Sequence, residues 1–133
     1  MADLIDAKSA TLESIKNVFE AAYFDVEIND GDLKIEGKNY TFWAVLDKNK
    51  QFLRYYVLIQ RNKKAKDSQL LKFISEVTDY PLIRPMVLDN VFGFDCYVWL
   101  ENGISKKNII TSFRAFEEIS QYAISEDQFN VLL

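Results

Sequence analysis

The nine residues from Phe52 to Gln60, FLRYYVLIQ, constrain the fold more than any other segment of the chain. Their aromatic, β-branched and aliphatic side chains predict a β-strand. A strand in a sheet with one wet face alternates apolar and polar residues, but here both alternating sets are largely apolar or aromatic. One set is expected to meet the protein's own core, so some other structure is needed to cover the second set.

The segments on either side of this strand predict an α+β domain. Helical and strand periodicities follow one another in the order α-β-β-β-α-β-β-α. Because the strands meander instead of alternating with helices, we expect one domain over residues 1–133, with an antiparallel sheet and helices packed on one face. The first predicted helix is capped by Ser9 or Thr11 and runs to about Ala22, and strands are predicted at 23–28, at 33–46 (broken or bulged at Gly37) and at 52–60. A second helix is capped by Asp67 or Ser68 and ends before Pro81, and strands follow at 82–88 and 94–101. A third helix is capped by Ser105, and one helical turn begins at Ser125.

The alternation within each strand assigns side chains to the two faces of the sheet. The more uniformly aliphatic set, which on the first strand is Phe24, Val26 and Ile28, is expected to face the helices. The other set mixes aromatic and polar residues, as protein interfaces do. Exposed aromatics of an ordinary strand, a loop, or the C-terminal tail FNVLL folded over this face are the alternatives. The residues predicted to bind a partner are Trp43, Tyr56, Leu58, Tyr97 and Trp99.

Composition excludes several kinds of chemistry. The chain has no histidine and a single cysteine, Cys96. Catalysis by Ser-His-Asp or Cys-His groups, His-ligated zinc, thiolate zinc and iron–sulfur clusters are therefore excluded. Four glycines form no phosphate-binding cluster, so no nucleotide site is indicated. We expect no cofactor and no metal, and we expect Cys96 to be a small buried apolar residue.

Charge bears on partners and location. A net charge of −4 and a pI of about 4.9 make nucleic acid and anionic membranes poor partners. The N-terminus MADLIDAKSA lacks the pattern of a signal peptide, and no apolar run is long enough to span a bilayer, so the cytoplasm is the expected location. The basic segment from Arg61 to Lys66 is interpreted as a solvated loop. Lys106 and Lys107 oppose the dipole of the last helix, and the sequence assigns them no purpose.

The segment DVEINDGDLKIE, residues 25–36, superficially resembles a calcium-binding loop. Its glycine, Gly31, stands one residue later than such a loop requires, and a strand pattern follows where a helix should begin. Asn-Asp-Gly is a common hairpin turn, in which Gly31 supplies a positive φ. A β-hairpin is therefore the better interpretation.

The run YFDVEINDGDLKIEGKNYTFWAVLD, with the preceding helix, resembles the YbjN family of bacterial proteins. That resemblance implies a fold similar to class I type III secretion chaperones, whose element order is the order predicted here. It also implies a dimer that binds proteins. Neither family has a catalytic motif to carry over to this sequence.

Two classes of function remain. The first is a non-enzymatic, cytoplasmic protein-binding domain that forms a homodimer and binds an unidentified protein through the sheet, as a chaperone or regulator. An acidic immunity protein that neutralises a basic toxin belongs to the same class. The second is a small carboxylate-dependent enzyme or ligand-binding domain, which would require a pocket where carboxylates converge.

Overall fold

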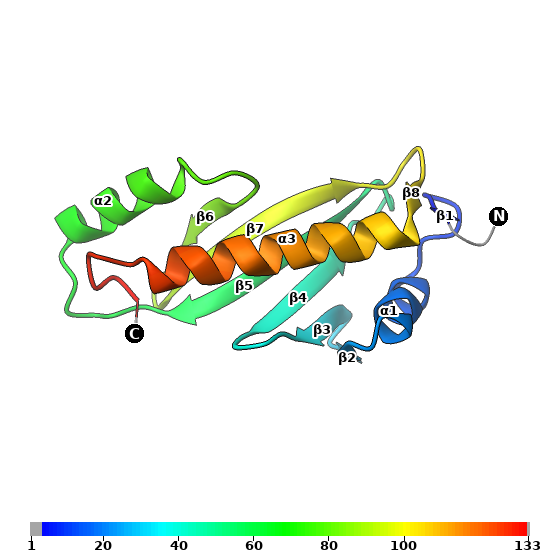
Figure 1. The fold of residues 1–133 in the computed structure, drawn as a ribbon, viewed down its shortest axis with the longest axis horizontal. Helices are drawn as coiled ribbons and strands as arrows, with labels where there is room; N and C mark the ends of the chain where they lie inside the picture. Colours follow the sequence, from blue (N-terminus) through cyan, green and yellow to red (C-terminus); the bar gives the residue numbers. More distant parts are fainter. Residues whose placement is uncertain (1–3, 133) are drawn as a thin grey trace.

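The computed structural model describes residues 4–132. Met1–Asp3, which begin the segment that was expected not to be a signal peptide, and Leu133, the last residue of the FNVLL tail, lie outside the described residues. A six-stranded antiparallel sheet in the order β2-β3-β4-β5-β7-β6 forms the body of the molecule (Figure 1). Its strands are β2 (Asp25–Asn29), β3 (Asp32–Glu36), β4 (Thr41–Leu46), β5 (Phe52–Gln60), β6 (Arg84–Val87) and β7 (Val91–Trp99), and a separate ribbon pairs β1 (Leu4–Ile5) with β8 (Ile104–Ser105).

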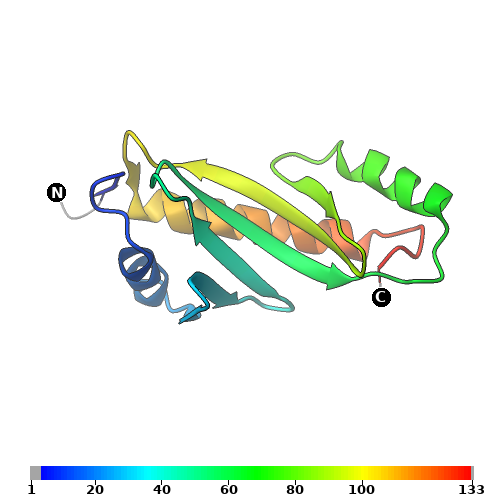
Figure 2. The same cartoon turned by 180° about the vertical axis from the view of Figure 1, so that it is seen from behind.

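Three helices pack on one face of the sheet. The long helix α3 (Lys106–Ser125) crosses the sheet lengthwise, with α1 (Leu12–Ala21) beside β2 and α2 (Asp67–Val77) towards β6 (Figure 1). All three helices contact the same face of the sheet. Phe19 of α1 and Phe113 of α3 both contact Tyr55 of β5. Phe73 of α2 contacts Phe92 of β7, which lies on the same face as Tyr55. Seen from behind, the sheet lies in front of α3 (Figure 2). No described helix is long and apolar enough to cross a membrane.

The core is built around the ring of Phe113. It makes edge-to-face contacts with four other rings, at centroid distances of 5.2–5.4 Å, and each such pair adds about 0.5–1.5 kcal/mol beyond area burial. One of these rings comes from α1, one from the residue just before β2, one from β4 and one from β5. The Phe113 side chain therefore connects two helices, α1 and α3, to the centre of the sheet. Its partners are Phe19, Phe24, Phe42 and Tyr55.

The fold class predicted from the sequence is confirmed, and the structure adds detail. The segment 33–46 divides at Gly37 into β3 and β4, and the Asp30-Gly31 turn has positive φ at both residues, 53° and 84°, as a two-residue hairpin turn of type I′ requires. Thr11 caps α1, accepting a 2.9 Å hydrogen bond from the Ser14 N–H, and Ser105 caps α3.

Some local expectations were wrong. Lys66, rather than Asp67 or Ser68, occupies the cap of α2, and Gln69 completes it by accepting the Lys66 N–H. The helical turn expected from Ser125 is absent in the described tail because α3 itself continues to that residue. Ile28 was expected to be buried but is 42% exposed. Because β2 leads away from α1 towards the hairpin turn, the helix covers Phe24 and no longer covers Ile28.

Candidate protein-contact surface

The face of the sheet opposite the helices, called the outer face here, carries every residue predicted to bind a partner. Trp43 and Tyr56 are directly opposite each other on β4 and β5, and their rings stack with centroids 6.3 Å apart and planes 12° apart. On β7, Tyr97 lies opposite Arg54, and Trp99 lies opposite Phe52. The intervening residues of β5, including Tyr55, point into the core.

Exposure divides these residues into two groups. Leu58, Tyr97 and Trp99 are 40%, 48% and 55% exposed. Trp43 and Tyr56 are half-buried against each other and against neighbouring side chains. The structure adds Phe52, whose ring contacts Tyr97 edge-on at 5.0 Å and stacks on Trp99 at 6.3 Å. The rings of Phe52, Tyr97 and Trp99 thus contact one another at one end of the outer face. Tyr97 and Trp99 remain exposed to solvent there.

A row of paired residues crosses the outer face through all six strands. Each member lies directly opposite the next in the sheet register, so the side chains share one face. The row begins with an acidic residue on the β2 edge, passes through the aromatic stack at its centre, and ends with a basic residue on the β6 edge. Its members are Glu27, Lys34, Trp43, Tyr56, Asp95 and Arg84.

Asp95 is fully buried although it lies on the outer face, because two arginines cover its carboxylate. Arg84 binds it with two hydrogen bonds, Nε to Oδ1 at 2.9 Å and Nη2 to Oδ2 at 2.8 Å, and Arg54 Nε reaches Oδ2 at 2.8 Å. Burial alone would raise the pKa of Asp95, but the hydrogen bonds from Arg84 and Arg54 outweigh it and hold the pKa below its usual value.

The same arginines pack against the aromatic residues. The Arg54 guanidinium lies 5.2 Å from the Tyr56 ring, and that of Arg84 lies 5.3 Å from the Tyr97 ring. Arginine stacked on tyrosine next to an ion pair is a composition enriched at protein interfaces. The alternation along their strands puts Arg54 and Asp95 on the same face as Tyr56 and Tyr97. Arg84 could not be placed in this way, because an irregular edge segment that contains Pro85 has no clear alternation.

The C-terminal tail lies elsewhere. Asn62 N–H bonds the Val131 carbonyl at 2.8 Å, and Gln69 Nε2 bonds the Phe129 carbonyl at 2.8 Å. Leu132 forms a bridge with Arg61, so residues 129–132 pack beside the end of β5 and the start of α2 (Figure 2). This arrangement differs from the alternative in which the tail covers the outer face.

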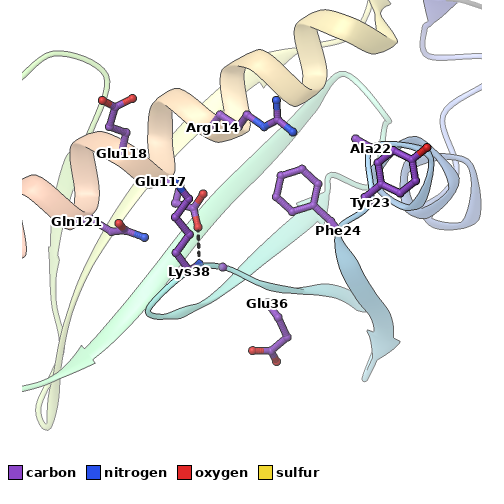
Figure 3. Close-up of a pocket in the computed structure, with 10 residues that line it drawn as sticks. Ala22, Tyr23, Phe24, Glu36, Lys38, Arg114, Glu117, Glu118 and Gln121 are labelled. Atoms are coloured by element: carbon purple, nitrogen blue, oxygen red, sulfur yellow. Dashed lines mark hydrogen bonds between the residues drawn. The ribbon is translucent and has the colours of Figure 1, made fainter.

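A cavity of about 740 Å³ lies on the other side of the sheet, between the end of α1, the β3–β4 turn and the middle of α3 (Figure 3). Its polar side chains include Arg114 and Glu117 of α3. Glu117 is buried, and its Oε2 accepts a 3.0 Å hydrogen bond from the Lys38 N–H. Gly37 permits this contact, since a Cβ at that position would collide with the Glu117 carboxylate. The sequence gives no sign of this cavity, because three separate segments form it.

Cys96 is buried on the inward side of β7, as expected. Burial, and secondly the nearby Asp95 charge, raise the pKa of its thiol to about 12. A thiol with so high a pKa is almost wholly protonated at neutral pH and is a poor nucleophile.

Comparison with known proteins shows the fold. No family model matches the chain, and no curated protein matches it. Among solved structures, YbjN from E. coli, described as a proposed transcription regulator, superimposes with a TM-score of 0.79 over 97% of this chain and 98% of its own, at 12% identity. A chain of the HopA1–SchA chaperone–effector complex superimposes with a TM-score of 0.59 over 80% of this chain and 87% of its own, at 11% identity. The fold implied by the YbjN and secretion-chaperone resemblance is confirmed.

Proposed function

We propose that this protein acts in the cytoplasm by binding another protein through the outer face of its sheet, as a chaperone or regulator and without catalysis. The observation that carries the proposal is a sheet face that none of the described helices covers, on which Leu58, Tyr97 and Trp99 are exposed. Tryptophan, tyrosine and arginine dominate the binding energy of protein interfaces. The structural neighbours, one described as a regulator and one taken from a chaperone–effector complex, favour the same class of function.

The outer face combines apolar anchors with fixed charges. Phe52, Tyr97 and Trp99 provide large rings at low conformational cost, and the Arg54–Asp95–Arg84 cluster provides oriented hydrogen-bonding groups beside them. The Asp95 charge is already satisfied within the chain, so a partner that covers it meets no unpaired buried charge. Hydrogen-bond acceptors of a partner can still reach both arginines, because the side chain of Arg54 is 29% exposed and that of Arg84 is 62% exposed.

Homodimerisation is part of the same proposal. The row from Glu27 to Arg84 is acidic at one end, aromatic in the middle and basic at the other. A two-fold axis through the Trp43–Tyr56 stack would place the acidic end of one copy against the basic end of the other, as an isologous interface requires. A second copy would therefore occupy the same surface as a protein partner and compete with it.

Analytical ultracentrifugation and affinity capture from the native host test this proposal. The variants are Trp43→Ser and Trp99→Ser, with Tyr122→Ser as the matched control because Tyr122 is 55% exposed, like Trp99, but lies on α3. We expect the two tryptophan variants to weaken self-association and to lose the specific partner, and the Tyr122 variant to keep both. A monomer whose capture survives both tryptophan substitutions would show that the outer face is the wrong surface.

A further inference from the structure

The charged residues that line the cavity between α1, the β3–β4 turn and α3 are Glu36, Lys38, Arg114, Glu117 and Glu118. Two of them, Arg114 and Glu117, are opposite charges on α3 that stay apart. Arg114 and Glu117 are one turn apart on α3, a spacing at which such residues commonly form an ion pair. Here they do not pair, and within residues 4–132 neither forms an ion pair with any other residue. Both side chains line the cavity, and Figure 3 shows Arg114 extending towards Phe24 while Glu117 turns towards Lys38.

Each charge is held in place by a separate contact. The Arg114 guanidinium lies 5.4 Å from the centre of the Phe24 ring, a cation–π contact. The Glu117 carboxylate is tied through Oε2 to the Lys38 N–H at 3.0 Å, and in the described chain its Oε1 accepts no hydrogen bond. Glu117 is only 7% exposed, and a buried carboxylate without a cationic partner is costly. Nearby, the Gln121 Nε2 atom is buried and donates to no described group.

The residue at the mouth of the cavity is also unusual. Tyr23, the residue after the C-cap of α1, lies in the left-handed region with φ 68°, at the position where helices with this ending prefer glycine. Its side chain is 97% exposed, so the chain gains no packing from it. A tyrosine that costs the fold stability, lines the cavity and is almost fully exposed is well placed to close over a ligand.

We propose that this cavity binds a small zwitterion, whose carboxylate pairs with Arg114 and whose ammonium group pairs with Glu117. The separation of the two charges by contacts with Phe24 and Lys38 means that the site does not need to break an internal ion pair before binding. A volume of about 740 Å³ falls within the range of small-molecule sites, and it exceeds the size of one amino acid. A free amino acid and a peptide with a basic and an acidic side chain present the same chemistry, and the test distinguishes them.

Amide chemical shifts in ¹H–¹⁵N NMR spectra of the full chain provide the test. The probes are 6-aminohexanoate, which has both charges, hexylammonium, which has only the cation, and hexanoate, which has only the anion. We expect saturable shifts near Tyr23, Lys38 and Glu117 with 6-aminohexanoate, and binding weaker by about tenfold with either singly charged probe. Comparing the affinities of glycine, 4-aminobutanoate and 6-aminohexanoate shows which distance between the ammonium and carboxylate groups fits the cavity best. Equal binding of hexanoate and 6-aminohexanoate, or no saturable shift at millimolar ligand, would overturn the proposal.

Variants locate the site. Arg114→Gln and Glu117→Gln are each expected to weaken 6-aminohexanoate binding about tenfold, and Glu20→Gln, on the exposed side of α1, is expected to change nothing. Tyr23→Gly is expected to raise Tm by about 2–4 °C and yet to weaken binding, a combination that a purely structural tyrosine would not give. Unchanged affinity in Glu117→Gln with the fold intact would place the ligand elsewhere.

A blocked peptide identifies the source of the zwitterion. Acetyl-Lys-Ala-Glu-amide carries both charges on side chains and has no charged termini. Binding at least as tight as that of 6-aminohexanoate would support a peptide segment as the ligand, and markedly weaker binding would support a free amino acid. Neither result depends on the outer face, so this proposal and the proposed protein-binding function succeed or fail separately.

Discussion

The hydroxyl of Tyr55, on the central strand, donates a 3.0 Å hydrogen bond to the main-chain carbonyl of Ile109 in α3. The Ser112 hydroxyl lies 3.3 Å from the Tyr55 hydroxyl oxygen. Tyr55 is fully buried, so this is a polar link through the middle of the aromatic core. It fixes the position of α3 along β5 more specifically than apolar packing alone could do.

Replacing Tyr55 by Phe is expected to lower the free energy of unfolding by about 1 kcal/mol at neutral pH, because hydrogen bonds to Ile109 and Ser112 are lost while the ring stays. Burial raises the pKa of Tyr55 far above its usual value of about 10. Above that pH the unfolded chain loses the tyrosine proton and the folded chain keeps it, so stability falls as pH rises. Urea unfolding between neutral pH and pH 11 should show a shallower decline in Tyr55→Phe than in the wild type. Equal declines would contradict this assignment.

Asp95→Asn is expected to destabilise the protein by about 2 kcal/mol, since a buried acceptor for three arginine hydrogen bonds loses its charge. The lowered pKa of Asp95 also has a pH signature. Its stabilisation is complete above the unfolded pKa of about 3.9 and disappears as pH falls through the lower, folded value. Thermal unfolding from pH 6 to pH 2 should therefore decline less in Asp95→Asn than in the wild type. Asp89→Asn serves as the control, because Asp89 is exposed on the β6–β7 turn, two residues before β7 begins.

Gly37→Ala is expected to cost about 1–3 kcal/mol through overpacking. The new Cβ would lie 2.8 Å from the Phe42 ring and 2.8 Å from the Tyr40 carbonyl, and it would collide with the Glu117 carboxylate. Gly31→Asn is the control, since asparagine tolerates the positive φ of the hairpin turn and nothing lies near a Cβ there. Chemical denaturation of both variants measures the difference. A Gly37→Ala protein as stable as Gly31→Asn would mean that the β3–β4 turn can move away from α3.

The two tryptophans should differ in solvent access. Trp99 is 55% exposed, whereas Trp43 is half-buried in its stack with Tyr56. In the single-tryptophan variants Trp43→Phe and Trp99→Phe, acrylamide should quench Trp99 more strongly than Trp43 when the protein is dilute. If the outer face is the binding surface, quenching of Trp99 should decrease as a dimer or complex forms. Quenching that stays the same through association would contradict the proposed surface.

The sequence predicted the α+β class and the two faces of β5 because that information is local. Alternation within one strand is enough to place Tyr55 inward and Tyr56 outward, whatever the strand's neighbours are. The turn at Gly31 is likewise a local backbone requirement, because its φ is 84°. Gly37 marks the break between β3 and β4, but one contact that requires a glycine there comes from Glu117 of α3. Ile28 was misassigned because alternation identifies a face and does not tell how far along it the helices reach.

The parts that escaped prediction depend on contacts between distant segments. Arg84 meets Asp95 only because β6 pairs with β7 in one register, and nothing within either segment specifies that register. The cavity joins α1, the β3–β4 turn and α3, so Arg114 and Glu117 look like ordinary surface residues of a helix until the turn is placed against them. The one local signal of that site was Tyr23, which stands just after the end of α1 where a glycine is usual.

The order of strands in the sheet also determines when each edge is protected during synthesis. Strands β2 to β5 are successive hairpin neighbours and can pair as they leave the ribosome, but the second partner of β5 is β7. β7 can pair with β5 only after residues 61–90 have been synthesised, which takes about 2–6 s at about 5–20 residues per second. Until then a nine-residue strand presents a bare hydrogen-bonding edge rich in aromatic and aliphatic side chains. The nascent chain is therefore most prone to aggregate in that interval, and a ribosome-bound holdase would be most useful to it there.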